Sequence, residues 1–97
     1  MNRNKKIEIS EIASVIATLK NDKNVADFMI EILTETELET LSKRWQILKM
    51  LNEGRTQRDI AQELKVSLCK VTRGSKILKN RKSIVTKCLV KEKKDEQ

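Results

Sequence analysis

The stretch that decides the fold is TQRDIAQELKVSLCKVTR, residues 56–73, whose apolar residues recur at the spacing of two short helices joined by a tight turn. Thr56 followed by Asp59 marks the start of the first helix, and Ser67 caps the second. The side chains expected to face inward are Ile60, Ala61, Leu64, Val66, Leu68 and Val71. The pattern predicts a helix-turn-helix over about residues 56–80.

The turn and the outer face of this motif have their own signals. Lys65 stands where a glycine is usual, because the backbone there needs a positive φ, and a lysine should cost on the order of 1 kcal/mol. The second helix is expected to turn a basic, hydrogen-bonding face outward, formed by Cys69, Lys70, Thr72, Arg73 and Lys76. Such a face is of the kind that enters the major groove of DNA.

Helical periodicity extends over the rest of the chain. Apolar residues at three- and four-residue steps predict helices over residues 7–20 and 25–33. Thr34 with Glu37 is a capping-box signature that begins a third helix ending at Gly54, and a last helix starts at about Lys82. We therefore expect one all-α domain of six helices over residues 1–97, with residues 1–6 and 91–97 as frayed tails.

The composition excludes several classes of protein. The 97 residues include no proline, two glycines and two aromatic side chains, which does not suit a β-sandwich or barrel. Without a single histidine, and with two cysteines nineteen positions apart, catalysis and metal binding are not expected. No long apolar segment or signal-peptide core is present, so we expect a cytoplasmic protein that is neither an enzyme nor attached to a membrane.

The charge is distributed unevenly. The formal net charge is +7, and residues 65–91 contain nine basic residues and no acidic one. Residues 25–42 instead carry five acidic residues and no basic one. The basic half suits a nucleic-acid phosphate backbone, although charge alone also fits RNA or an anionic membrane surface. The scarcity of aromatic side chains disfavours both RNA and membranes.

The first three helices have wide apolar faces for a chain of this size. A monomer of about 100 residues buries only about 60 to 65% of its surface, so these faces exceed what one chain covers. The surplus predicts a homodimer. The alternative is that these are the scattered exposed aliphatic side chains found on most proteins.

The segment VTRGSKILK, residues 71–79, together with TQRDI, residues 56–60, resembles the bacterial tryptophan repressor family. Leu33, Thr34 and Arg44 extend the resemblance upstream. It implies an intertwined homodimer that binds a double-stranded DNA operator, with L-tryptophan as corepressor. It also implies that Arg44 and Arg73 enclose the indole ring, that Leu33 and Thr34 form a wall, and that Gly74 forms the floor.

The chain departs from the family at the amino end of this ligand site. Ile77 stands where the family has a serine that helps to hold the ligand amino group. The change opens the possibility of a deaminated indole acid, of another ligand, or of none. Read without the family, Arg44 could pair with a nearby acid such as Glu39, and Arg73 could contact phosphate; Trp45 is most simply a core residue.

The family's DNA-contacting positions and the outward basic face together give the predicted DNA-binding residues Gln57, Arg58, Leu68, Cys69, Lys70, Thr72, Lys76 and Lys79. Arg58 is the candidate for reading bases, since its guanidinium fits guanine O6 and N7. We expect phosphate contacts from Gln57, Thr72 and Lys79, and a contact to either a base or a phosphate from Lys70.

Three functions follow. The first is a DNA-binding transcriptional repressor activated by L-tryptophan and controlling genes of tryptophan biosynthesis or uptake. The second is a DNA-binding protein of the same fold that needs no ligand, which Ile77 favours. The third is a nucleic-acid accessory or protein-interaction module.

Overall fold

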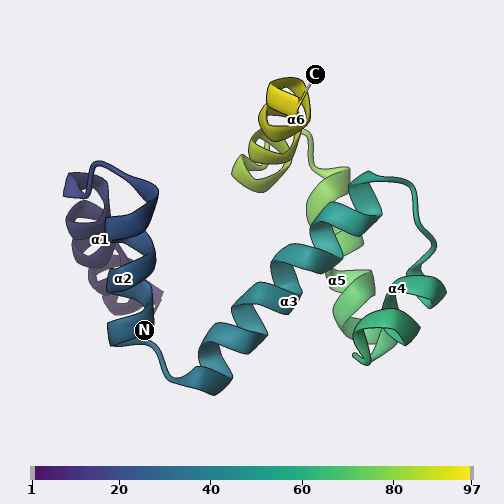
Figure 1. The fold of residues 1–97 in the computed structure, drawn as a ribbon, viewed down its shortest axis with the longest axis horizontal. Coiled ribbons are helices and arrows are strands. Elements are labelled where there is room, and N and C mark those ends of the chain that lie inside the picture. Colours follow the sequence, from purple (N-terminus) through teal and green to yellow (C-terminus); the bar gives the residue numbers. More distant parts are fainter. Residues whose placement is uncertain (1, 97) are drawn as a thin grey trace. The chain divides into compact units, whose positions relative to one another are not determined.

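A computed structural model describes the backbone of residues 2–96 and the side chains of residues 8–90. The described backbone forms six helices and contains no strand, so the predicted all-α fold is confirmed (Figure 1). The helices are α1 (Asn2–Thr18), α2 (Asp22–Ile32), α3 (Glu35–Asn52), α4 (Gln57–Leu64), α5 (Leu68–Lys79) and α6 (Ile84–Glu96).

The chain divides into two compact units, Met1–Leu38 and Glu39–Gln97, and the division falls within α3. That residues 1–97 act as a single domain remains a prediction. The frayed tails expected at residues 1–6 and 91–97 lie outside the part of the chain whose side chains are described.

Side-chain caps set the helix boundaries of the first unit. The Asn21 side chain accepts a hydrogen bond from the Asn24 amide at 2.9 Å, which begins α2 after a short link from α1. At the start of α3, the Thr34 amide donates to Glu37 Oε1 at 2.9 Å, and the Glu37 amide donates to Thr34 Oγ1 at 3.1 Å. The reciprocal pair confirms the predicted capping box.

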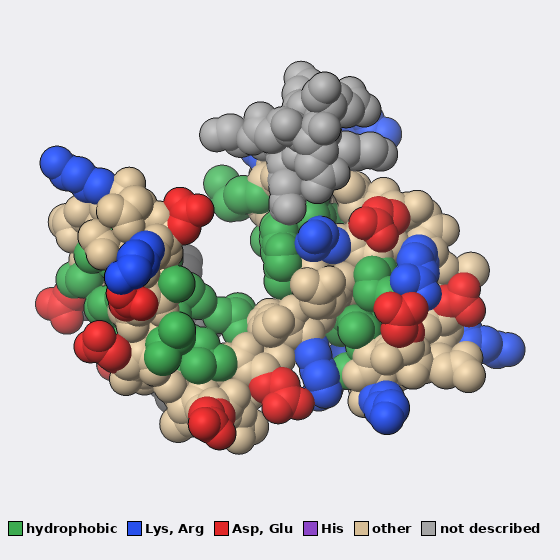
Figure 2. Space-filling model, in the orientation of Figure 1, with side chains coloured by type: hydrophobic (Ala, Val, Ile, Leu, Met, Phe, Trp, Pro, Cys, Tyr) green, Lys and Arg blue, Asp and Glu red, His purple; other side chains and the backbone are tan. Residues whose placement is uncertain are grey.

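The first unit leaves much of its apolar surface uncovered. No residue of α2 is buried, although one side of the helix is apolar and the other polar. Figure 2 shows apolar side chains on the surface of this unit. The large apolar residues most exposed there are Ile9 at 65%, Ile12 at 44%, Val15 at 44%, Ile30 at 61% and Ile32 at 55%.

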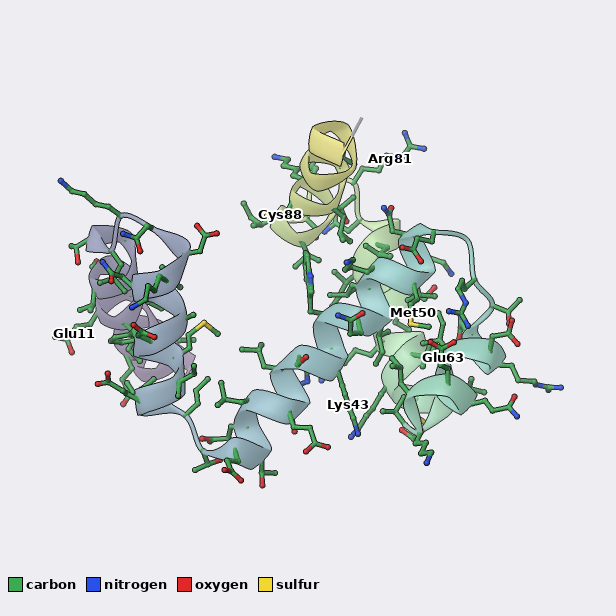
Figure 3. All side chains as sticks on the ribbon, viewed as in Figure 1. Glu11, Lys43, Met50, Glu63, Arg81 and Cys88 are labelled. Atoms are coloured by element: carbon green, nitrogen blue, oxygen red, sulfur yellow. The ribbon has the colours of Figure 1, made fainter. Side chains whose placement is uncertain are left out.

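The second unit holds the core of the chain. Its buried cluster joins Ile47 and Met50 of α3 to Ile60 of α4 and Val71 of α5. Figure 3 shows the Met50 side chain directed toward α4 and α5. Around this cluster pack the partly buried Leu51, Ala61, Leu64 and Val66. Five of the six inward positions predicted for residues 56–73 are therefore buried or partly buried.

The prediction for Leu68 was wrong, because its side chain is 51% exposed. Leu68 is the first residue of α5 and follows the Ser67 cap. Val71, which is fully buried, fills the contact between the two helices instead.

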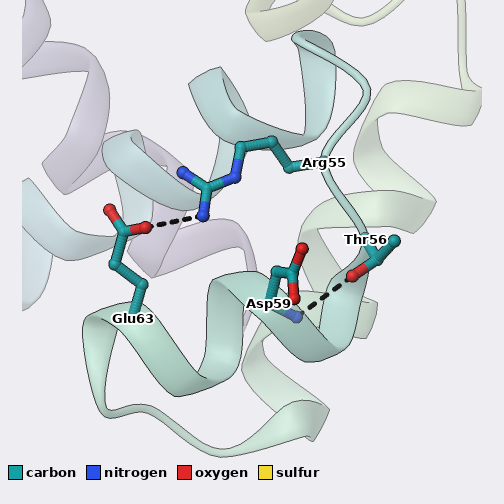
Figure 4. A network of polar contacts seen from close by, with 4 residues as sticks. All are labelled: Arg55, Thr56, Asp59 and Glu63. Atoms are coloured by element: carbon teal, nitrogen blue, oxygen red, sulfur yellow. Dashed lines mark hydrogen bonds and ion pairs between the residues drawn. The ribbon is translucent and has the colours of Figure 1, made fainter.

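Polar contacts define both ends of α4 (Figure 4). Thr56 Oγ1 accepts from the Asp59 amide at 3.1 Å, as its cap position predicts. Arg55 Nη2 donates to Glu63 Oε1 at 2.6 Å, which ties the preceding loop to the last turn of α4. This hydrogen bond raises the pKa of the Arg55 guanidinium above its ordinary value. Lys65 then adopts φ 56°, the left-handed conformation expected at the turn.

A network of hydrogen bonds holds the turn between α5 and α6. Thr86 Oγ1 donates to the Asn80 carbonyl at 3.2 Å, and Ser83 Oγ accepts from the Thr86 amide at 3.2 Å. Helix α6 consequently begins at Ile84, two residues later than the sequence predicts.

We expect Lys65→Gly to raise the free energy of unfolding by about 1 kcal/mol, because glycine has no Cβ to oppose a positive φ. Lys65→Ala removes the same charge and keeps the Cβ, so it should give no such increase. Urea denaturation at equal protein concentration measures both variants. An equal gain in the alanine variant would contradict backbone strain as the cause.

Candidate functional site

The outward side of α5 carries a shallow hollow of about 460 Å³ lined by Leu68, Cys69, Thr72, Arg73 and Lys76. We call these residues the α5 outer face. Four of them are predicted DNA-binding residues, and the fifth, Arg73, is a predicted ligand-binding residue. The face combines two cations, a hydroxyl group and apolar surface, which suits phosphate and base-edge contacts.

Two predicted DNA-binding residues are hydrogen-bonded to each other. Thr72 Oγ1 of α5 donates to Gln57 Oε1 of α4 at 2.8 Å. The bond links the N-terminus of α4 to the middle of α5 and fixes the Gln57 side chain. The two N–H groups of the Gln57 side-chain amide are still free to donate to a phosphate. Arg58, Lys70 and Lys79 are exposed.

A deeper cavity of about 460 Å³ lies among α3, α5 and α6 of the second unit. Its lining residues are Leu41, Arg44, Trp45, Ile47, Leu48, Lys70, Arg73, Gly74, Ile77 and Val85. It therefore brings together four predicted ligand residues, Arg44, Arg73, Gly74 and Ile77. The other two, Leu33 and Thr34, belong to the first unit and are not among its lining residues.

Sequence reasoning missed some of these lining residues as parts of a ligand site. Trp45 is half-buried at the cavity wall, where a core position was expected. Lys70, predicted only at DNA, also lines the cavity. The position of Lys70 could have been predicted from helix spacing. Residues three and four apart share a face of a helix, and Lys70 lies three residues before Arg73 and four before Gly74.

The two arginines of the cavity are exposed, and among residues 8–90 neither takes part in an ion pair. Glu39, which was the alternative partner for Arg44, instead accepts from Lys43 at 3.2 Å. Both guanidinium groups therefore remain available to a ligand carboxylate or a phosphate.

Gly74 lets α5 approach α3 closely. A Cβ atom at this position would lie 3.0 Å from Ile47 Cγ2 and 3.3 Å from Leu51 Cδ1. Its missing side chain thus faces α3, while its backbone contributes to the cavity wall. Helix packing is consequently a second reason for this glycine, beside the ligand floor implied by the family resemblance.

Cys69 and Cys88 are free and exposed, and Cys88 lies on α6 (Figure 3). Within the described residues, no three His, Cys, Asp or Glu side chains gather as metal ligands would. No helix in that part of the chain is long and apolar enough to cross a membrane.

We expect Gly74→Ala to lower the free energy of unfolding by about 1 to 3 kcal/mol without any ligand, because the new methyl group crowds Ile47. Where space is open, the same change inside a helix raises the free energy of unfolding by about 0.5 to 1 kcal/mol. Whether Gly74→Ala lowers or raises the free energy of unfolding therefore decides whether the site is crowded. Chemical denaturation measures it, with Lys76→Ala as an exposed control on α5. In an Ile47→Ala background the cost should shrink; an unchanged cost would rule out this contact.

The sequence is similar to proteins of one known family. Residues 8–93 match the family described as Trp repressor protein. A Trp operon repressor homolog from Chlamydia caviae is 36% identical over 70 residues, covering 71% of this chain and 69% of the relative. The homolog from Chlamydia trachomatis serovar D is 33% identical over 67 residues, covering 68% and 71%. No solved structure gives a significant match. The chain belongs to the Trp repressor family.

Proposed function

We propose that the chain is a sequence-specific DNA-binding repressor gated by a small indole carboxylate, L-tryptophan being the ligand that the family resemblance implies. One observation carries the proposal. Arg73 lines both the α5 outer face and the α3–α5–α6 cavity. A ligand in the cavity would therefore contact a residue of the helix proposed to read DNA, which couples the two binding events.

On the DNA side, α5 is proposed to enter the major groove, while α4 crosses the backbone with its first turn close enough to reach a base edge. Arg58 is exposed at the first turn of α4 and is assigned the guanine contact. Gln57 and Thr72 position the motif on phosphates. The absence of acidic residues from 65 to 91 supports this orientation, because no carboxylate of that segment opposes the phosphate backbone.

On the ligand side, Arg44 and Arg73 are proposed to enclose an aromatic ring and pair with a carboxylate. The cavity volume of about 460 Å³ lies in the range of small-molecule sites, and its walls are mostly apolar. Such a repressor would act in the cytoplasm on genes of tryptophan biosynthesis or uptake.

A homodimer is proposed from the apolar surface of the first unit. Ile30 and Ile32 of α2 are 61% and 55% exposed, and Ile9 of α1 is 65% exposed. Several large apolar side chains exposed on one small unit suit an interface better than a free surface. Two copies would also provide the paired reading helices that a two-fold operator requires.

The alternative is a DNA-binding protein that needs no ligand. Ile77 favours it, because an apolar side chain at the cavity wall offers no hydrogen bond to the ammonium group of tryptophan.

DNA binding is tested by selecting a sequence from a random duplex library and measuring affinities by fluorescence anisotropy. Arg58→Ala should reduce discrimination between the selected and a scrambled duplex by about 1 to 3 kcal/mol. Lys79→Ala should weaken both duplexes by a similar factor and lower the salt slope by about 1. Unchanged discrimination in Arg58→Ala would contradict the assignment of the guanine contact to Arg58.

The same selected duplex tests whether a ligand controls DNA binding. An indole carboxylate should raise operator affinity by a factor of about 5 to 150, and the operator should raise ligand affinity by the same factor. An operator affinity that no indole carboxylate changes would leave the ligand-independent alternative.

Sedimentation equilibrium tests the dimer. At micromolar concentration the mass should be twice the chain mass of 11.2 kDa. Ile30→Glu should shift the equilibrium toward monomer, because a charge would be buried in the apolar interface. Glu31→Gln, at the neighbouring exposed position, is the control. A folded wild-type monomer would contradict the proposed dimer.

A further inference from the structure

One hydrogen bond joins the two helices of the helix-turn-helix through side chains that are both proposed to contact DNA. Thr72 Oγ1 of α5 donates to Gln57 Oε1 of α4 at 2.8 Å, and both side chains are partly buried. A threonine inside a helix often donates to the carbonyl four residues earlier, which here is that of Leu68. The Thr72 hydroxyl donates instead to a side chain of the neighbouring helix, fifteen residues earlier in the sequence.

This bond determines which of the two side chains can donate to a phosphate. A hydroxyl group has a single hydrogen, and Thr72 gives it to Gln57. The phosphate oxygens of DNA only accept hydrogen bonds, so Thr72 has none to donate to them unless the bond to Gln57 breaks. The Gln57 side-chain amide keeps both of its N–H groups, and no group among residues 8–90 accepts from them.

We propose that Thr72 is a positioning residue, whose hydroxyl orients the Gln57 amide so that its N–H groups face a phosphate of the DNA backbone. The inference rests on the proposed function, because it concerns how the helix-turn-helix contacts DNA. It replaces two independent phosphate contacts, one from each residue, with a single contact to which both residues contribute.

The benefit of the bond is that it orders a flexible side chain before DNA binds. Glutamine is among the side chains that lose most rotamer freedom when they are fixed. Ordering such a side chain during binding weakens the affinity by a factor of about 2 to 10. Because Thr72 also lines the α5 outer face, the bond holds Gln57 of α4 beside that face.

A double-mutant cycle with the full-length protein and the selected duplex tests the proposal. Thr72→Val removes the hydroxyl and nearly keeps the shape of the side chain, so it should weaken binding by a factor of about 2 to 10 per subunit. Gln57→Ala removes the contact itself and should weaken binding more. The protein with both changes should bind like Gln57→Ala, because Thr72 then has no amide to orient.

Three other results of the cycle would overturn the inference. Losses that multiply in the double variant would mean that each residue has a phosphate contact of its own. A double variant that binds like Thr72→Val would mean that Thr72 makes the contact and Gln57 orients it. An unchanged affinity in Gln57→Ala would exclude the phosphate contact.

Uncharged phosphates distinguish positioning from a purely structural role of the bond. A methylphosphonate placed at each position of the selected duplex in turn should identify one phosphate at which Gln57→Ala no longer weakens binding. Thr72→Val should lose its effect at the same phosphate, because the amide that it orients has lost its acceptor. A Thr72→Val effect that persists there, or that disappears only at another phosphate, would contradict the inference, as would a scan in which Gln57→Ala weakens binding throughout.

Two further variants are controls for the substitution itself. Thr72→Ser keeps the hydroxyl and should recover most of the affinity that Thr72→Val loses; an equal loss in both would exclude the hydroxyl as the cause. Thr40→Val makes the same substitution at an exposed position of α3 and should leave the affinity unchanged. Urea denaturation checks that each variant is folded, and Thr72→Ala replaces Thr72→Val in the cycle if the valine variant is not.

The outcomes separate the inference from the proposed function. Sequence-specific binding in which the two losses multiply would overturn the inference and leave the DNA-binding repressor intact. Failure to select any duplex from the random library would overturn the proposed function, and the inference with it.

Discussion

The arrangement of the second unit depends on the close contact of α3 and α5 at Gly74. Because position 74 carries no side chain, Ile47 and Leu51 of α3 can lie against the α5 backbone. This contact brings Arg44 on α3 and Arg73 on α5 to one cavity. A wider spacing of the two helices would separate the guanidinium groups. The cost of a glycine within a helix, about 1 kcal/mol, is offset here by packing.

Helix α5 serves the core, the cavity and the outer face at once, because 3.6 residues per turn distribute its side chains around the axis. Val71 packs into the core cluster, and Ile77 lines the cavity wall. Thr72 and Lys76 lie on the outer face. Only Arg73 belongs to both the cavity and the outer face. Its guanidinium group is therefore where a bound anion would most directly alter the surface that the outer face is proposed to present to DNA.

Local signals predicted much of this fold. The Thr34 and Glu37 pair, the Thr56 and Ser67 caps and the positive φ of Lys65 all appear in the structure, because each depends on residues within one turn of the chain. The exposure of Leu68 could not be predicted from such local signals. At the first residue of a helix the periodic pattern has no preceding turn, so the direction of the side chain there depends on tertiary packing.

The candidate cavity was only partly predictable for the same reason. The family resemblance named Arg44, Arg73, Gly74 and Ile77, which do line one cavity. Trp45 and Lys70 were assigned elsewhere, because a single helix does not reveal which neighbouring helix covers a given face. The approach of α3 to α5 decides that, and it follows from a missing side chain at Gly74 whose consequence is visible only in three dimensions.

The distribution of buried surface connects the two units to the proposed dimer. Among the described side chains, the buried apolar residues all belong to the second unit, whereas Ile9, Ile12 and Val15 of α1 and Ile30 and Ile32 of α2 are exposed. A helix pair with no buried residue among its described side chains has little to stabilise it against the conformational entropy of the chain. The apolar side chains that α1 and α2 expose are the surface that the proposed dimer would cover. If a second copy covers them, folding of the first unit and assembly of the two α5 helices become one equilibrium.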